Sequence, residues 1–359
     1  MQETAPGVAA GTEDRLISWL RKELVSRGSR DFLGNDVARL PLSGDWAISV
    51  DQQIEGVHFP AGLGSERIGR RLVAVNLSDL AAAAAEPRFG FATLAAPADF
   101  DHKGFFRGLL DAGREHGLTL AGGDLARSDR IHAALTVCGK RGRRRRFLGR
   151  DLAREGDSLW LGGSVGESAL GRSLLARGAD AGGAALRLPA TPAIPRSLRG
   201  AARAALARHL DPEPQLELGA WLGGRRRAAA IDISDGLLLD LRRLARASRI
   251  RCELDVSALP SSPGFSELAR QLELDPTIVA LTGGEDYVLL FCLPERLRPP
   301  NAFRATRVGR VSAAVDAEDD AAVILRGFEL PPGLAAGWDH LAEADQAPWR
   351  PETEPRGSR

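Results

Sequence analysis

Six aspartates in this chain share a context that suits metal-ion chemistry. They are Asp36 in GNDVARL, Asp51 in ISVDQQIEGVHF, Asp79 in NLSDLAA, Asp124 in AGGDLARSD, and Asp232 and Asp235 in AIDISDGLLLDL. A single aspartate beside glycine is commonly a turn or N-cap residue, and Asp235 could simply cap a helix that begins near Gly236. Asp232 is harder to explain in this way, because Ile231 and Ile233 flank it and an unpaired charge in a buried strand is costly.

If these carboxylates converge, they require cations, and oxygen ligands without histidine or cysteine favour Mg²⁺. With only three lysines, the chain has no GxxxxGK[ST] phosphate loop. Metal ions would then bridge the oxygens of a polyphosphate such as ATP. Gly123, next to Gly122, would let backbone amides approach a phosphate, Arg150 could add a forked contact, and Ser234 would lie near the nucleotide.

Alternating apolar stretches and helical periodicity predict an α/β protein with two domains. A basic run, KRGRRRRFLGR, interrupts the apolar rhythm and suggests the boundary between residues 13–147 and 148–345, with a disordered segment 1–12 and a frayed tail 346–359. Helices are predicted at 12–27, 65–85, 101–117, 167–177, 197–210, 215–222 and 236–248. Strands are predicted at 46–51, 89–97, 131–139, 157–163, 227–232, 286–294 and 321–327, and AGGDLARSD is predicted to be a glycine-rich turn.

The overall composition argues for a cytoplasmic protein. The net charge is +1, and three scattered cysteines without a CxxC pair suit neither a disulfide framework nor a zinc site. No stretch approaches the roughly 18 apolar residues of a membrane span. We therefore expect neither a membrane nor a nucleic-acid partner, although the basic run could contact nucleic acid.

Eight motifs together resemble the thiamine-monophosphate kinase family. GNDVARL, SVDQQIEGVHF, AVNLSDLAAAAAEP, GGDLARS, GRDLAREGD, AIDISDGLLLDL, GGEDYVLLF and GWDHL occur in that family's order over about residues 34–341. The resemblance implies the aminoimidazole-ribonucleotide synthetase fold, in which the N-terminal α/β domain forms a β-barrel in a homodimer. It also implies ATP-dependent phosphorylation of thiamine monophosphate by direct in-line transfer with Mg²⁺.

The same resemblance assigns roles to particular residues. The family's metal positions match Asp36, Ser49, Val50 (through its carbonyl), Asp51, Asp79, Asp124, Asp232 and Asp235. Its ATP contacts match Gly123, Asp124, Arg150 and Ser234. Its thiamine contacts match His58, Glu285 and Trp338, and a cationic aromatic ligand suits a carboxylate and an aromatic face. The chain departs from the usual motifs at Asn35, Val50, Leu125 and Ala126.

Other functions stay open at this point. GGSVG matches the GxSxG elbow of serine hydrolases, with Ser164 as the nucleophile. Selenophosphate synthetase and the hydrogenase-maturation protein share the implied fold. The first normally carries a reactive cysteine near its N-terminus and the second a C-terminal cysteine, whereas the first cysteine here is Cys138 and the chain ends in PRGSR. A degenerate nucleotide-binding relative is a further alternative.

Overall fold

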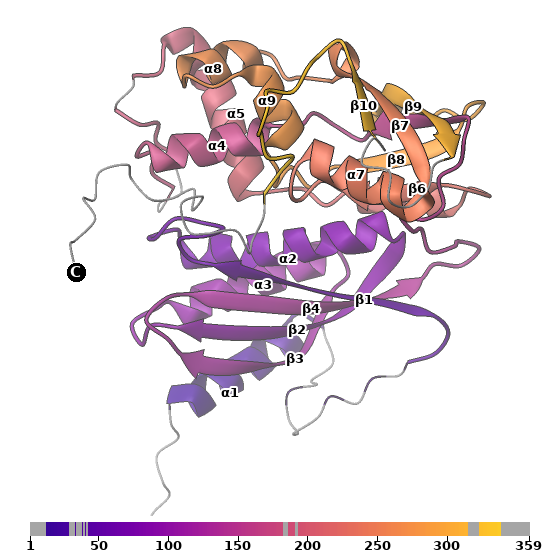
Figure 1. Cartoon of the computed structure of the whole chain (residues 1–359). Coiled ribbons are helices and arrows are strands. Elements are labelled where there is room, and N and C mark those ends of the chain that lie inside the picture. The colour runs from indigo at the N-terminus through magenta and orange to yellow at the C-terminus, as the bar shows by residue number, and fades with distance from the viewer. Residues whose placement is uncertain are drawn as a thin grey trace, which may run out of the picture.

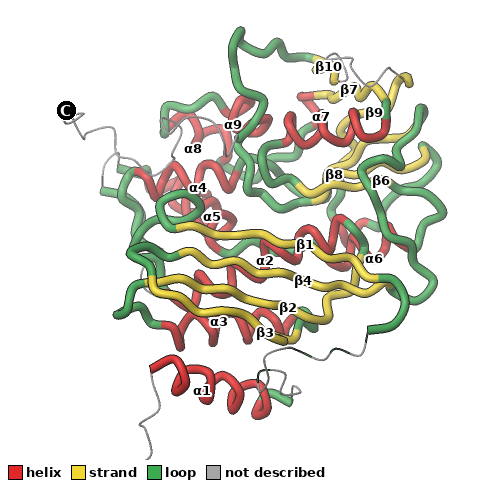
Figure 2. The backbone as a smooth tube through the Cα atoms, turned by 60° about the horizontal axis from the view of Figure 1, so that its bottom comes forward, coloured by secondary structure: helices red, strands yellow, loops and turns green. Residues whose placement is uncertain are grey.

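The computed structural model describes residues 12–28, 33, 38, 40, 42–181, 186–190, 193–314 and 323–338. Asp36, residues 1–11 of the predicted segment 1–12, and the predicted tail 346–359 lie outside these residues. The first half of the chain builds an open four-stranded sheet with helices against one face (Figures 1 and 2). Its elements are α1 (Thr12–Ser26), β1 (Trp46–Ile54), α2 (Ser65–Ala82), β2 (Ala85–Ala96), α3 (His102–Glu115), β3 (Thr119–Arg127) and β4 (His132–Arg141).

The strand order of this sheet is β1-β4-β2-β3. Strands β1 and β2 each pair antiparallel with β4, and β2 pairs parallel with β3. Both β1 and β3 are therefore edge strands. The predicted barrel would need these edges to pair with a second copy, so the barrel stays a prediction.

The second half of the chain forms a six-stranded sheet in the order β10-β7-β9-β5-β8-β6, with only β10 and β7 parallel among its described pairs. Its strands are β5 (Asp157–Leu161), β6 (Ala229–Asp232), β7 (Ile250–Asp255), β8 (Leu289–Pro294), β9 (Thr306–Ala314) and β10 (Val323–Arg326). Its helices are α4 (Glu167–Ala176), α5 (Arg199–Leu210), α6 (Leu216–Gly223), α7 (Leu237–Ser248), α8 (Phe265–Gln271) and α9 (Pro276–Thr282), with short 3₁₀ turns at Arg196–Leu198, Val256–Ala258 and Asn301–Phe303.

Helix α2 is the central element, because it lies between the first sheet and the second half of the chain (Figure 1). It contacts β1 and β4 on one side and α6 and β6 on the other. It also packs very closely on α3: a Cβ atom at Gly69 would lie 2.1 Å from the carbonyl oxygen of Phe105, and one at Gly108 would lie 1.9 Å from that of Glu66. Glycine at both positions therefore permits this helix contact.

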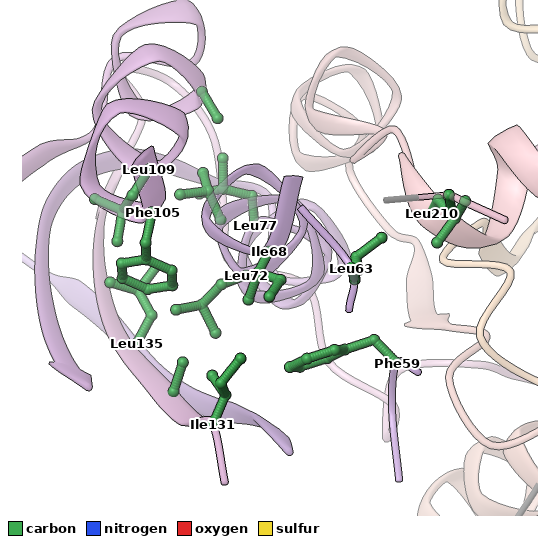
Figure 3. Close-up of a cluster of buried hydrophobic side chains, with 14 of the residues drawn as sticks. Phe59, Leu63, Ile68, Leu72, Leu77, Phe105, Leu109, Ile131, Leu135 and Leu210 are labelled. Atoms are coloured by element: carbon green, nitrogen blue, oxygen red, sulfur yellow. The ribbon is translucent and has the colours of Figure 1, made fainter. Parts of the chain in front are cut away.

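The apolar face of α2 forms the centre of the first core (Figure 3). Ile68, Leu72 and Leu77 from α2 meet Phe105 from α3 and Leu135 from β4, and all five are essentially inaccessible to solvent. Burying side chains of this size typically stabilises a fold by about 1.5–3 kcal/mol each. This packing fixes the helix whose polar residues enter the site described below.

The mixed α/β class predicted from the sequence is confirmed, but some local predictions were wrong. The stretch AGGDLARSD is not a turn, since residues 119–127 form strand β3 in parallel register with β2. Strands β7 and β9 and helices α8 and α9 were not predicted. Among the described residues, no helix is long and apolar enough to cross a membrane.

Candidate active site

Strand β1 presents oxygen-bearing side chains to helix α2. Ser49 Oγ donates a hydrogen bond to the carboxylate of Asp79, and the backbone N–H of Asp51 donates to Asn76 Oδ1 at 2.9 Å. Successive residues of a strand point to opposite faces, so Ser49, Asp51 and Gln53 lie on the same side.

The opposite face of β1 is apolar and open. Ile48 and Val50 have 68% and 61% of their surfaces exposed. The side chain of Val50 therefore points away from α2, and only its backbone carbonyl could serve as a ligand. This geometry is compatible with the carbonyl role that the family motif assigns to Val50.

Asp232 lies at the end of β6, where the apolar strand reaches the site. Its side chain is buried and accepts a hydrogen bond from Ser78 Oγ at 2.7 Å. Burial, together with the nearby carboxylate of Asp79, raises the pKa of Asp232 to about 7. Burial also raises the pKa of Asp79, while the hydroxyl of Ser49 and the guanidinium of Arg150 oppose that rise. Two neighbouring carboxylates with raised pKa values form a site that a cation would stabilise.

The turn after Asp232 is held by Asp240, which sequence analysis did not single out. Its carboxylate accepts backbone hydrogen bonds from Ser234 at 3.1 Å and Asp235 at 3.0 Å. Arg243 bridges the two acids, at 2.6 Å from Asp235 and 2.7 Å from Asp240. The N-cap residue of α7 is Gly236, so Asp235 precedes the cap position, and its carboxylate pairs with Arg243.

Glu285 lies at another wall of the site and is surrounded by basic side chains. It contacts Arg71 at 2.6 Å, His209 Nδ1 at 3.6 Å and Arg172 at 3.8 Å. Burial acts to raise the pKa of Glu285, but Arg71, His209 and Arg172 outweigh it and lower this pKa. Glu285 is therefore ionised and held in place mainly by Arg71, another residue that the sequence analysis missed.

Trp338 and His58 complete the same wall. The backbone N–H of Trp338 donates to the carbonyl of Asp235 at 2.8 Å, and the guanidinium of Arg172 lies 5.9 Å from the centre of the indole ring. His58 Nδ1 accepts a hydrogen bond from the backbone N–H of Ile54 at 3.0 Å. That bond leaves Nε2 as the nitrogen that carries the proton in the neutral ring.

A cavity of about 390 Å³ joins these groups. Most of the sequence-predicted site residues line it: Ser49, Val50, Asp51, His58, Asp79, Arg150, Asp232, Ser234, Asp235, Glu285 and Trp338. Motifs that are widely separated in the sequence thus meet in one place. Helix α2 spans the cavity, since Arg71 contacts Glu285 and Ser78 contacts Asp232 seven residues later, about 10 Å along the helix.

Gly123 and Asp124 do not line this cavity. They belong to edge strand β3, while Ser49 to Asp51 belong to β1 at the opposite edge, so three strand spacings, roughly 14 Å, separate them. Glycine at 123 also has a structural reason, because a Cβ atom there would lie 1.8 Å from the carbonyl oxygen of Ala92. Within one chain, these two residues are therefore apart from the other predicted ligands.

The donor set suits a hard cation, although no complete ligand cage is formed. Asp79, Asp232 and Ser49 offer oxygen donors, which is the chemistry that Mg²⁺ prefers. In the described part of the chain, no three acidic, histidine or cysteine side chains gather closely enough to hold an ion alone. Mg²⁺ commonly uses one or two carboxylates, with waters and substrate phosphates as its other ligands, so the residues present fit such a site.

Ser164 lacks the surroundings of a hydrolase nucleophile. Its hydroxyl donates to Glu167 at 2.6 Å, just before α4, and Glu167 is its one side-chain partner within the described ranges. A catalytic serine requires a base within hydrogen-bond reach, and imidazole is the usual one. This contact instead orders the first turn of α4.

Comparisons with known proteins agree with this architecture. Residues 34–140 match the family described as AIR synthase related protein, N-terminal domain. The chain is similar to thiamine-monophosphate kinase from Aquifex aeolicus, with 30% identity over 91% of this chain and 97% of the relative. It is similar to the enzyme of the same name from Caulobacter vibrioides, with 34% identity over 87% and 84% of the two chains.

Solved structures are also similar to this chain in fold. A structure described as AaThiL complexed with AMPPCP and TMP has a TM-score of 0.70 and 28% identity, covering 90% of this chain and 96% of the other. Thiamine-monophosphate kinase from Stenotrophomonas maltophilia has a TM-score of 0.72 and 29% identity, with coverage of 88% and 97%. A hydrogenase maturation protein at 22% identity and a TM-score of 0.61 shares the fold alone.

Proposed function

Because the chain belongs to the thiamine-monophosphate kinase family, we propose that its cavity is the active site in which ATP and thiamine monophosphate react. The reaction is the ATP-dependent phosphorylation of thiamine monophosphate, which yields thiamine diphosphate and ADP. A phosphate oxygen of thiamine monophosphate forms the new bond to the γ-phosphorus of ATP, and the bond from that phosphorus to ADP breaks. The relative solved with AMPPCP and TMP supports this pairing of substrates.

One observation carries the assignment: the cavity has an acidic end and a distinct wall that suits a thiamine ring. Asp79 and Asp232 lie at the acidic end, and Glu285 and Trp338 lie in the wall that Arg71 supports. Two substrates that meet through their phosphates would place those phosphates near the two aspartates. The thiamine ring would then lie near Glu285 and Trp338.

The acidic end is where we propose that Mg²⁺ binds, held by Asp79 and Asp232 with the hydroxyl of Ser49. A cation held there would supply positive charge to the phosphates during transfer. Arg150, which lines the same cavity, adds a cation for a phosphate. Positioning of the acceptor depends on the chain itself, because Arg71 fixes the carboxylate of Glu285.

A homodimer would explain how Asp124 on β3 could serve the same metal site as the predicted ligands near β1. The motif resemblance predicts Asp124 to be a metal ligand, yet in one chain it lies on the strand farthest from β1. Both statements hold if the partner's Asp124 reaches this cavity. The exposed Ile48 and Val50 on edge strand β1 support such a contact between copies. A cytoplasmic location is also part of this proposal, supported by three free, buried cysteines.

A direct assay tests the function. Purified protein is incubated with ATP, Mg²⁺ and thiamine monophosphate, and thiamine diphosphate and ADP are measured. We expect equal amounts of both products, no transfer when EDTA replaces the metal, and free thiamine to be a poor acceptor because it lacks a phosphate. Folded protein that transfers no phosphate with any divalent metal would refute the proposal.

A further inference from the structure

A second cavity, of about 950 Å³, is lined by arginines from three separate parts of the sequence. The basic run supplies Arg146 and, just after it, Arg154; the loop before β6 supplies Arg225, Arg226 and Arg227; and the turn after β8 supplies Arg296. Among the described lining residues, Glu295 is the one acid. The linear sequence shows the basic run but not its convergence with the other two stretches.

This cavity is distinct from the active site. It contacts Ala228 and Pro294, whereas the active site contains Asp232. Ala229 begins β6 and Asp232 ends it, so the two cavities lie at opposite ends of this strand, about 10 Å apart along it. The arginine cavity therefore shares no lining residue with the cavity proposed as the active site.

Some of these arginines already have structural partners. Arg227 forms a 2.6 Å ion pair with buried Asp157, and the guanidinium of Arg225 lies 4.6 Å from the centre of the Trp221 ring. The acid Glu295 lies 3.6 Å from Arg307, so it is partly neutralised from outside the cavity. Among the described residues, no acidic side chain that lines the cavity forms an ion pair with the remaining arginines.

Arg146, Arg226 and Arg296 have no side-chain hydrogen bond or ion pair with any residue that the structure describes, and all three are exposed. Cations gathered in one concavity repel one another and produce a strong positive field within it. A planar guanidinium donates two parallel hydrogen bonds to phosphate, which makes arginine the preferred residue for phosphate recognition. A dianionic phosphate also neutralises more of this charge than a single carboxylate does.

We propose that the arginine cavity binds a small molecule that carries two or more phosphate groups. The apolar side chains of Phe147, Leu152 and Leu297 lie between the arginines and offer a surface for the non-ionic part of such a ligand. A nucleic-acid strand fits less well, because non-specific strand binding uses a series of aromatic stacking residues and Phe147 is the one aromatic ring in the described lining.

Isothermal titration calorimetry with inorganic tripolyphosphate tests the proposal. The full chain is used in EDTA and low salt, because EDTA removes the metal through which we propose that the active site holds phosphates, and acidic side chains outnumber arginines in the lining of that site. We expect one binding event per chain. The double variant Arg226→Gln/Arg296→Gln should weaken it by roughly tenfold or more, since it removes two guanidiniums that would donate charge-assisted hydrogen bonds to phosphate. Arg203→Gln, an exposed arginine on α5, is the matched control and should leave binding unchanged.

Two further arms identify the source of the phosphates. If ADP binds more tightly than pyrophosphate and both weaken in the double variant, the ligand is a nucleotide; equal affinities indicate an inorganic polyphosphate. Kinase activity should stay at the wild-type level in the double variant, which shows that it is folded. Absence of binding, binding that the double variant does not change, or a 12-nucleotide RNA that binds more than tenfold tighter than tripolyphosphate would overturn the proposal.

Discussion

A guanidinium nitrogen of Arg71 lies 2.6 Å from a carboxylate oxygen of Glu285, and this ion pair connects the two halves of the chain. Arg71 belongs to helix α2 and is 1% exposed, while Glu285 precedes strand β8. Arg71 also donates to Gln53 and to the backbone carbonyl of His209, so its position is fixed by three partners. The orientation of Glu285 therefore depends on a residue of helix α2, which packs on the first sheet.

Removing Arg71 should affect both stability and substrate binding. Arg71→Met leaves the carboxylate of Glu285 without its nearest cation, and breaking a buried pair typically costs about 3–5 kcal/mol. We expect a lower midpoint of unfolding, and a KM that rises more for thiamine monophosphate than for ATP. Arg71→Met/Glu285→Gln should recover much of the stability without recovering the KM. A double variant no more stable than Arg71→Met would contradict the idea that the unpaired charge is the cause.

Asp232→Asn should separate function from stability. The substitution removes a charge that burial and Asp79 disfavour, so the metal-free protein should be as stable as wild type or more stable, while kcat falls severely. Wild type should also gain stability from Mg²⁺ with ATP by mass action, and the variant should lose most of that gain. Thermal unfolding with and without ligand measures both effects.

Asp101→Ala serves as the control for that experiment. Asp101 caps α3 by accepting a hydrogen bond from the backbone N–H of Gly104, and it does not line the cavity. Losing such a cap costs about 0.5–2 kcal/mol, with kcat unchanged. If Asp232→Asn instead behaves like Asp101→Ala, then Asp232 has a structural role.

Three buried carboxyl groups should together lower the stability of the metal-free protein as the pH rises, and they outnumber buried His209, whose pKa burial lowers to about 3 and which acts in the opposite direction. Burial raises the pKa of Asp232 and of Asp286 to about 7 and that of Asp240 to about 6. A carboxyl group with a raised folded-state pKa holds its proton in the native state but loses it on unfolding between about pH 4 and 7. The unfolded state then binds fewer protons, so the free energy of unfolding decreases through this range.

Unfolding midpoints in EDTA should therefore be higher at pH 5.5 than at pH 8. Mg²⁺ should reduce this difference, because a bound cation favours the ionised carboxylates. Asp232→Asn should also reduce it, since one titrating group is removed. A metal-free midpoint that rises steadily from pH 5.5 to pH 8 would be incompatible with these shifts.

Trp338 should contribute to recognition of the thiamine ring. Trp338→Ala removes an aromatic face that typically contributes ~0.5–2 kcal/mol to the binding free energy of a cationic aromatic ligand. We therefore expect the KM for thiamine monophosphate to rise while the KM for ATP changes little. Trp338→Phe should restore most of the affinity. Equal changes in both KM values would indicate that Trp338 serves packing near Asp235 instead.

Sequence patterns predicted the components of the site better than the contacts between them. The apolar run that ends at Asp232 correctly indicated a buried strand, and the carboxylate at its end lines the cavity. Arg71 and Ser78 were missed, although both are polar residues on a largely apolar helix, seven positions apart and hence on one face. Their partners, Glu285 and Asp232, lie more than 150 residues away, and local periodicity contains no information about such contacts.

Strands with ambiguous sequence patterns account for most errors in the predicted secondary structure. Residues 119–127 contain two glycines and an aspartate, which favour a turn, but pairing with β2 overrides that preference. Strand β9 contains two arginines and a glycine, so its alternation is weak. Neither strand could be distinguished from a loop until its neighbour in the sheet was known.

The alternation along β1 makes the length of this strand as important as its composition. Nine consecutive residues pair with β4, from Trp46 opposite Lys140 to Ile54 opposite His132. A one-residue insertion near the start of β1 would shift this register and turn every later side chain to the opposite face. Ile48 and Val50 would then point toward α2, and Ser49 and Asp51 would point to the open side. The cavity would lose these oxygen donors although no residue had been substituted, so we expect β1 to tolerate no change in length.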